Sequence, residues 1–160
     1  MNYKNFRKVI NNNIERAYFL GLSMQETDYE NAFNIMFENE PKTYITASKE
    51  IAEQRKEVDV CVKDLFELKA EPNSLIFIPR PYNWSRDNKE NYLSLSGRIY
   101  ELTKTLFSDG FSSLVYFDVD EDIEKFKLGE DVKSVADNLY KDFDAEVTEV
   151  NNKHIILEKL

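Results

Sequence analysis

Cysteine, histidine, glycine and proline are scarce in this chain of 160 residues, and each scarcity excludes certain folds or kinds of site. Cys61 is the only cysteine, so an internal disulfide and a zinc site built from cysteines are both excluded. Four glycines and four prolines are too few for a sandwich or barrel with many tight turns. The only histidine, His154, lacks the neighbours of a nucleophilic catalytic pair, and we expect it on the surface of a strand.

Long apolar runs and common catalytic motifs are also absent. No stretch reaches the roughly 18 apolar residues of a membrane span, and the amphipathic N-terminus lacks the apolar centre of a signal peptide. We therefore expect a cytoplasmic protein without membrane contact. The motifs GxxxxGK[ST], GxGxxG and HExxH do not occur. The sequence thus predicts no cofactor, no metal site and no catalytic residue, and it favours a protein that is not an enzyme.

Negative charge exceeds positive charge, with 30 acidic and 21 basic residues and a net charge of −9. A field of this sign repels phosphate backbones and anionic lipids, so direct binding of nucleic acid is not expected. The charge suits a basic protein partner, such as one that itself handles nucleic acid. Solubility alone is the alternative explanation.

Hydrophobic residues make up 42% of the chain, enough for a core, and their spacing differs between two regions. Residues 1–72 carry apolar residues at helical spacing throughout. We expect three helices there, packed on the rest of a single domain. They would span residues 6–18, the segment from Thr27 to Pro41, and residues 47–69.

Residues 73–160 predict a small α/β domain that ends in a β-hairpin. A strand, a long helix and a second strand imply a right-handed crossover and parallel pairing. The fold class is therefore α/β, with α+β as the alternative, and the order after the helical region is β-α-β-α-β-β. The expected elements are strands 74–78 and 113–119, helices 86–107 and 130–143, and a hairpin of 146–150 with 155–160.

Parallel pairing would bring two unusual segments to one edge of the sheet, where ligands of open α/β sheets bind. The loop of residues 79–86 combines arginines with aromatic rings, which suits an anion, a flat ring or a protein interface. In the simpler interpretation, Trp84 fills the end of the core and Arg80 pairs with Asp118 or Asp120. The candidate ligand or interface residues of this loop are Arg80, Tyr82, Trp84 and Arg86.

The second segment is acidic and follows the second strand. It could form an exposed patch that meets a basic partner, or its carboxylates could contact a hard cation. A solvent-exposed helix start is the simpler explanation. The candidate interaction residues are Asp118, Asp120, Glu121, Asp122 and Glu124.

One further segment resembles a known motif. Residues 45–53, followed by Val58 and Val62, are similar to part of a helix-turn-helix. The resemblance implies DNA binding, but the second helix would carry Asp59 and Asp64 toward a groove lined with phosphates. One uninterrupted helix is the better interpretation.

Three functions follow, in order of preference. The first is a non-catalytic acidic protein that binds a protein partner, in one version an inhibitor or nucleic-acid mimic from a phage or mobile element of a low-GC bacterium. The second is a small-molecule- or phosphate-binding α/β domain, in one version an enzyme, that uses the loop Arg80–Arg86. The third is a helix-turn-helix regulator. The aromatic content also allows a homodimer.

Overall fold

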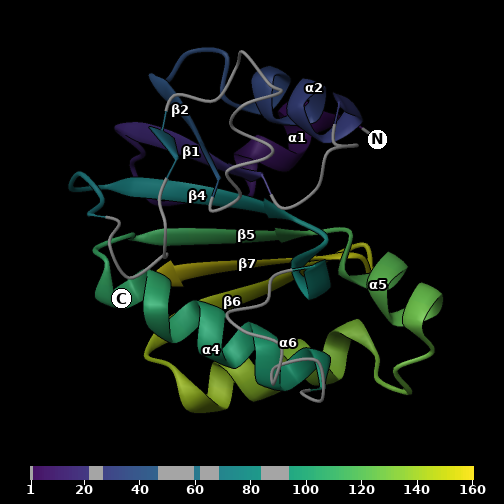
Figure 1. Cartoon of the computed structure of the whole chain (residues 1–160). Helices are drawn as coiled ribbons and strands as arrows, with labels where there is room; N and C mark the ends of the chain where they lie inside the picture. The colour runs from purple at the N-terminus through teal and green to yellow at the C-terminus, as the bar shows by residue number, and fades with distance from the viewer. Residues whose placement is uncertain (1, 22–26, 47–59, 62–68, 84–93) are drawn as a thin grey trace.

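The computed structural model describes residues 2–21, 27–46, 60–61, 69–83 and 94–160. Within these residues, strands and helices alternate along most of the chain (Figure 1). In chain order the elements are α1 (Tyr3–Lys8), β1 (Arg16–Gly21), α2 (Thr27–Met36), β2 (Lys42–Thr46), β3 (Val60–Cys61), β4 (Ser74–Pro79), the 3-10 turn η2 (Pro81–Asn83), α4 (Leu95–Ser108), β5 (Ser113–Phe117), α5 (Val119–Phe126), α6 (Val132–Asp142), β6 (Ala145–Val150) and β7 (His154–Lys159).

One mixed sheet of seven strands organises the described residues, in the order β3-β2-β1-β4-β5-β7-β6. The first five of these strands are parallel to one another. β7 runs antiparallel to β5 and pairs with β6 as a hairpin. Because β1 pairs with β4, residues 1–72 and 73–160 contribute strands to the same sheet.

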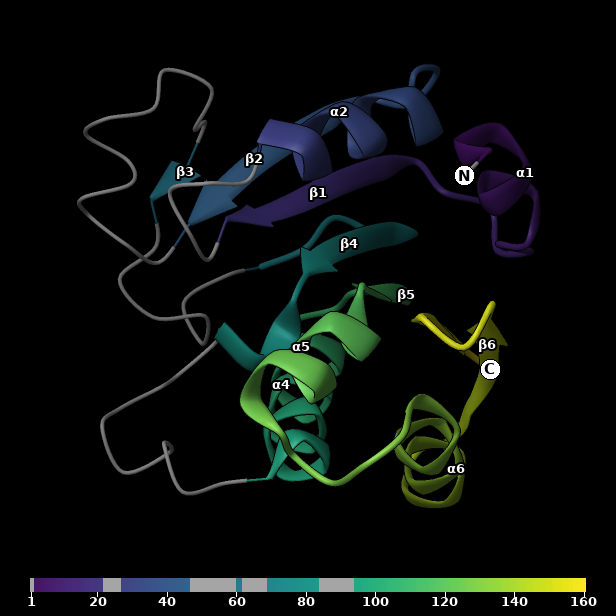
Figure 2. The ribbon, with the colours of Figure 1, turned by 90° about the vertical axis from the view of Figure 1, so that its right-hand side faces the viewer.

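Helices cover both faces of the sheet. Figure 2 shows α1 and α2 on one side and α4, α5 and α6 on the other. Successive strand residues point to opposite faces, so each central strand contributes side chains to two hydrophobic cores. In β4, for example, Phe77 packs under α2, whereas Ile76 and Ile78 pack against α4. Both faces are therefore buried, as parallel sheets require.

The expected organisation of residues 73–160 is confirmed. β4 and β5 pair in parallel, and β6 and β7 form the terminal hairpin. Asn151 and Asn152 occupy its turn with φ angles of 54° and 55°, the left-handed region that asparagine tolerates. The helix expected from residue 86 begins at Leu95 among the described residues, and α5 is an additional short helix after β5.

The structure corrects the prediction of three helices for residues 1–72. Among the described residues, the second helix is present as α2, which ends at Met36 and not near Pro41. The first ends at Lys8, and the segment from Arg16 to Gly21 is strand β1. The reason is that β1 is buried on both faces, so its continuous apolar run has no strand alternation and fits a helical spacing by coincidence.

The third predicted helix, residues 47–69, also fails where the structure describes it, because Val60–Cys61 is the short parallel strand β3. Ile45 and Thr46, which begin the segment that resembles a helix-turn-helix, end the neighbouring strand β2. Cys61 therefore lies in a strand and not in a helix. The remainder of the predicted helix, residues 47–59 and 62–68, lies outside the described residues. A helix-turn-helix is not compatible with these two strands.

No helix in the described part of the chain is long and apolar enough to cross a membrane.

We predict that Phe77→Ala lowers the free energy of unfolding by about 3–5 kcal/mol. Phe77 is fully buried, and its ring centroid lies 5.8 Å from that of Phe19 and 5.0 Å from that of Phe117. Urea denaturation followed by circular dichroism measures the change. Tyr140→Ala is the control, because Tyr140 is 69% exposed and should change stability by less than about 0.5 kcal/mol. Equal losses for the two variants would contradict this core assignment.

Candidate functional site

The carboxyl ends of the parallel strands meet at one edge of the sheet. In the register, Gly21 of β1 lies opposite Thr46 of β2, and Pro79 of β4 lies opposite Phe117 of β5. The chain builds outward from β1 to β2 and β3, then returns to place β4 and β5 on the other side of β1. Ligands of open α/β sheets bind outside the carboxyl ends at such a reversal. This carboxyl edge is therefore the candidate site.

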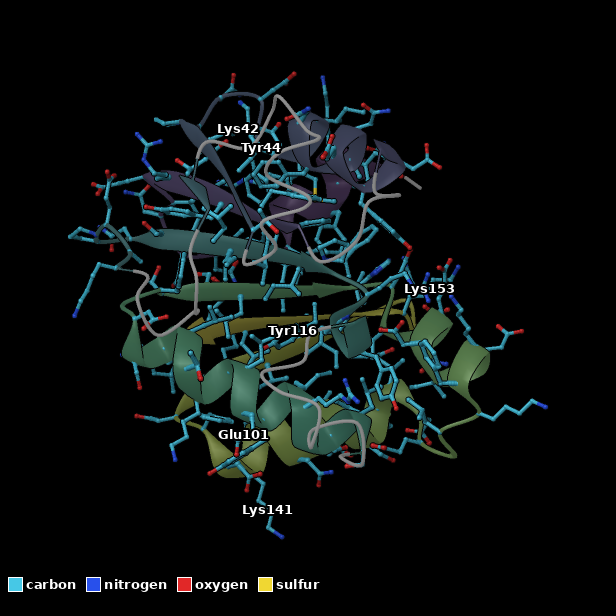
Figure 3. All side chains as sticks on the ribbon, viewed as in Figure 1. Lys42, Tyr44, Glu101, Tyr116, Lys141 and Lys153 are labelled. Atoms are coloured by element: carbon cyan, nitrogen blue, oxygen red, sulfur yellow. The ribbon has the colours of Figure 1, made fainter. Side chains whose placement is uncertain are left out.

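A sharp corner at Asp118 connects β5 to α5. Asp118 has φ 56° and ψ 43°, the left-handed region, which is uncommon for a residue with a side chain. Two hydrogen bonds fix the corner to the hairpin turn. The Asp118 backbone N–H donates to His154 Nδ1 at 3.0 Å, and the Val119 N–H donates to the Lys153 carbonyl at 2.8 Å. Figure 3 labels Lys153 at this end of β5.

Tyr29, in the first turn of α2, contacts the same corner from the face of the sheet that α2 covers. Its hydroxyl donates to Glu121 Oε2 at 3.1 Å, and its ring packs edge-on against Phe117. Burial, together with the nearby carboxylates of Glu121 and Asp120, raises the pKa of Asp118 to about 6, although a hydrogen bond from Tyr29 and the charge of Lys153 act in the opposite direction. Burial, Asp118 and Glu121 also raise the pKa of Tyr29, so its hydroxyl remains a donor.

His154 lies beneath this corner and is not the surface residue that the sequence predicts. Its side chain is 1% exposed. The ring stacks on Phe117 at a centroid distance of 4.0 Å and meets Phe6 edge-on. Burial, aided by Lys153, lowers the pKa of His154 to about 4, so the ring is neutral at pH 7. Since Nδ1 accepts a hydrogen bond, Nε2 carries the proton.

Arg80 forms a second corner, directly after β4. It has a φ of 49°, and its backbone N–H donates to the Phe117 carbonyl at 2.8 Å. Its Nε donates to Asp122 Oδ1 at 3.1 Å, and the other oxygen of Asp122 accepts the Tyr82 N–H at 2.9 Å. Arg80 thus pairs with Asp122, and not with Asp118 or Asp120 as the simpler interpretation of the sequence has it.

Tyr82 is held between two side chains. The Arg98 guanidinium carbon lies 4.1 Å from the centroid of the Tyr82 ring, and Arg98 Nη1 donates to the Tyr82 carbonyl at 2.9 Å. The Phe126 ring lies 4.5 Å from the Tyr82 ring, centroid to centroid. These contacts fix the position of Tyr82 beside the carboxyl edge. Trp84 and Arg86, the other two candidates of this loop, lie outside the described residues.

The N-terminus of the helix after this loop is not a free anion site. Ser94 caps α4, and the Leu95 N–H donates to Glu130 Oε1 at 3.0 Å. The Ser96 N–H donates to Glu130 Oε2 at 3.2 Å. The carboxylate of Glu130 therefore occupies the helix N-terminus that an anionic ligand would otherwise use.

The five acidic candidates are divided between the interior and the surface. Asp122 is fully buried, and Asp118 and Asp120 are partly buried. Glu121 and Glu124 are exposed. The expected continuous exposed patch is therefore not what the segment forms, because α5 turns Asp122 inward toward Arg80.

Buried polar atoms without a hydrogen-bond partner among the described residues occur at both ends of the sheet: Glu158 Oε1 lies at the amino end of β5, and three others lie at the carboxyl edge. Arg80 Nη2, Asp120 Oδ1 and His154 Nε2 are buried atoms without a hydrogen-bond partner among the described residues. Unpaired buried polar atoms are costly and call for an explanation, such as a ligand or a functional role. No group of three His, Cys, Asp or Glu side chains suited to a metal ion occurs in the described ranges.

Two shallow grooves lie elsewhere among the described residues. One, of about 300 Å³, runs between α4 and α6 and is lined in part by Tyr100 and Glu101. The other, of about 330 Å³, lies between α1 and the β6–β7 turn, beside Phe6 and Asn151. Neither contains a buried unpartnered polar atom, so neither competes with the carboxyl edge as a site.

Tyr29 and His154 lie at the candidate site, although the sequence analysis did not predict either of them as a site residue. Tyr29 has the spacing of a core residue of α2, and no local pattern reveals that its hydroxyl reaches Glu121, 92 positions along the chain. His154 could have been found by one signal. It opens the terminal strand, and the antiparallel pairing of that strand with β5 brings it beside Asp118.

No family model matches the chain, and no curated protein matches its sequence. Its fold is nevertheless similar to solved methyltransferase structures. The SAH-bound methyltransferase PaMTH1 of Podospora anserina is 13% identical with a TM-score of 0.51, over 91% of this chain and 72% of that one. A SAM-dependent methyltransferase from Aquifex aeolicus is 10% identical with a TM-score of 0.50, over 98% of this chain and 87% of that one. The chain thus has a Rossmann-like fold that these methyltransferases share.

This likeness corrects the leading functional hypothesis. A non-catalytic interaction protein or inhibitor of phage or mobile-element origin is contradicted by a fold shared with enzymes. The fold favours the alternative, a small-molecule-binding α/β domain. The protein partner and the homodimer stay predictions.

We predict that Asp118→Asn stabilises the protein at pH 7.5 by up to about 3 kcal/mol. The pKa of Asp118 is about 6 in the folded protein, against about 3.9 when unfolded. The ionised form therefore costs stability above pH 6, and the cost disappears as the pH falls through 6 toward 4. Asparagine tolerates the left-handed backbone equally well.

Urea unfolding at pH 7.5 and at pH 4 tests this prediction. The gain should be present at pH 7.5 and absent at pH 4. Glu124→Gln removes the same charge from an exposed position on α5 and serves as the control, with no gain at either pH. A loss of stability for Asp118→Asn at pH 7.5 would show that the ionised carboxylate stabilises the fold.

Proposed function

We propose that this chain binds S-adenosylmethionine at the carboxyl edge of its parallel strands and acts as a methyltransferase. The observation that carries the proposal is a pair of buried polar atoms at this edge, Arg80 Nη2 and Asp120 Oδ1, that have no hydrogen-bond partner among the described residues. The fold similarity to PaMTH1, whose structure is SAH-bound, supports the choice of ligand. The cytoplasm is the compartment we propose.

The hydrogen-bonding and charged groups at the edge match the chemical groups of S-adenosylmethionine. That molecule carries a carboxylate, an ammonium, a sulfonium and two ribose hydroxyls. The Arg80 guanidinium suits the carboxylate. The carboxylates of Asp118 and Asp120 suit the cations or the hydroxyls. A site of this charge favours a cationic ligand over a neutral analogue.

The β1–α2 connection departs from the glycine-rich turn that many nucleotide-binding α/β proteins use. Gly21 is the only glycine between the start of β1 and the end of α2, so the sequence has no GxGxxG there. At the end of β2, the Thr46 hydroxyl donates to the Gly21 carbonyl at 2.8 Å and is buried. The adenosyl group would therefore depend more on the β4 and β5 side of the edge.

When bound, S-adenosylmethionine supplies a methyl group activated by its sulfonium. Asp118, with a pKa of about 6, is ionised at neutral pH. Its carboxylate can hold a cationic group or accept the proton that an acceptor releases. Tyr29 donates to Glu121 and so orients a second carboxylate at the same place. Arg80 is fixed by Asp122 before any ligand arrives, which lowers the cost of ordering it.

Isothermal titration calorimetry with S-adenosylmethionine and S-adenosylhomocysteine tests the proposal. We expect binding of both, with the cationic S-adenosylmethionine the tighter ligand. Asp118→Asn should weaken binding of S-adenosylmethionine by about tenfold, the loss of one charge-assisted contact. It should weaken S-adenosylhomocysteine less, because that molecule lacks the sulfonium.

Glu124→Gln is the matched control, since it removes one charge from the same helix at an exposed position and should leave both affinities unchanged. Absence of binding of either compound at millimolar concentration would overturn the proposed ligand. Equal weakening by both variants would mean that net charge, and not the carboxyl edge, determines affinity.

A further inference from the structure

The backbone corner between β5 and α5 needs an acceptor for the partly buried N–H of Asp118. The Asp118 N–H lies beyond the paired residues of β5 and β7, which end at Tyr116 opposite Ile155. It finds that acceptor in His154 Nδ1 at 3.0 Å. An unpaired backbone N–H in the interior is strongly disfavoured. The left-handed conformation of Asp118 therefore depends on the ring of His154.

Packing alone does not explain a histidine at this position. The ring lies between Phe117 and Phe6, where phenylalanine would fit the apolar surroundings. Histidine leaves Nε2 buried without a partner among the described residues, which phenylalanine would avoid. What histidine adds is Nδ1, and the hydrogen bond that Nδ1 makes goes to Asp118.

The Asp118 carboxylate is held near the groups of the candidate site as a result. Its Oδ1 lies 3.6 Å from His154 Nδ1. Tyr29 of α2, Glu121 and Asp120 of α5 and Lys153 of the hairpin turn surround it. If the Asp118 N–H lost its acceptor, the residue could leave the left-handed region, and its carboxylate would turn away from Tyr29.

We propose that His154 is a positioning residue of the carboxyl edge, which holds Asp118 through its backbone N–H so that the Asp118 carboxylate faces the ligand. The inference rests on the proposed function for the identity of the ligand. The positioning itself is a property of the ligand-free protein and can be measured without any ligand.

Two substitutions separate the acceptor from the ring. His154→Asn keeps an acceptor, because the asparagine Oδ1 can take the place of Nδ1, but loses the ring that packs on Phe117. His154→Phe keeps the ring and loses the acceptor. A merely structural role predicts that stability and ligand affinity change together. A positioning role predicts that the variant with the weaker ligand affinity, His154→Phe, is not the variant with the lower stability.

The first measurement is the titration of the Asp118 carboxyl carbon by NMR in the ligand-free protein. The wild type should titrate with a pKa of about 6. His154→Asn should keep this value within about 0.3 units, whereas His154→Phe should shift it down by about one unit as the carboxylate gains solvent. An unchanged Asp118 pKa in both variants would overturn the inference, whatever the ligand proves to be.

The second measurement is calorimetric affinity for S-adenosylmethionine, with melting temperatures beside it. His154→Phe should bind about tenfold more weakly and melt no lower than His154→Asn, which should bind like the wild type. In an Asp118→Asn background, His154→Phe should cause no further loss. Full additivity there would contradict a role through Asp118. A wild type that binds nothing would overturn the proposed function, and the NMR titration would still decide the role of His154.

Discussion

The pairing of β1 with β4 is the interaction on which the rest of the structure depends. It joins the first half of the chain to the second in one sheet and fixes the point where the strand order reverses. Because the neighbouring strands are parallel, it also aligns the ends of β1, β2, β4 and β5 at one edge. Polar side chains from four distant segments can meet only because this pairing and register bring their strands together.

The same sheet explains why core residues and site residues touch. Phe117 ends β5 on the face covered by α1 and α2, within the aromatic cluster that contains Phe77 and Phe33. The His154 ring stacks on Phe117, and the Tyr29 ring meets Phe117 edge-on. The packing that stabilises this face therefore also orients the hydroxyl and the imidazole at the edge, so core and site cannot be altered independently at these positions.

The second half of the fold could be predicted because turn-forming residues, such as Asn151-Asn152, mark where its strands and helices end. The first half could not, because β1 is buried on both faces and shows no alternation. For the site, parallel pairing correctly predicted that Arg80 and the acidic segment share an edge. The partner of Arg80 was predicted wrongly, since the short helix α5, which turns Asp122 inward, leaves no signal distinct from an acidic loop.

The carboxyl edge concentrates features that cost stability. Arg80 and Asp118 both adopt left-handed backbone conformations, the Asp118 carboxylate has a raised pKa, and His154 is a buried neutral imidazole. Each of these costs free energy on its own, and a sequence selected only for stability would replace them with glycine, asparagine or phenylalanine. They occur together at the edge where open α/β sheets bind their ligands. Under the proposed function, contacts of the ligand with these polar groups would offset part of this cost, and the two aromatic and aliphatic cores make the fold stable enough to tolerate the rest.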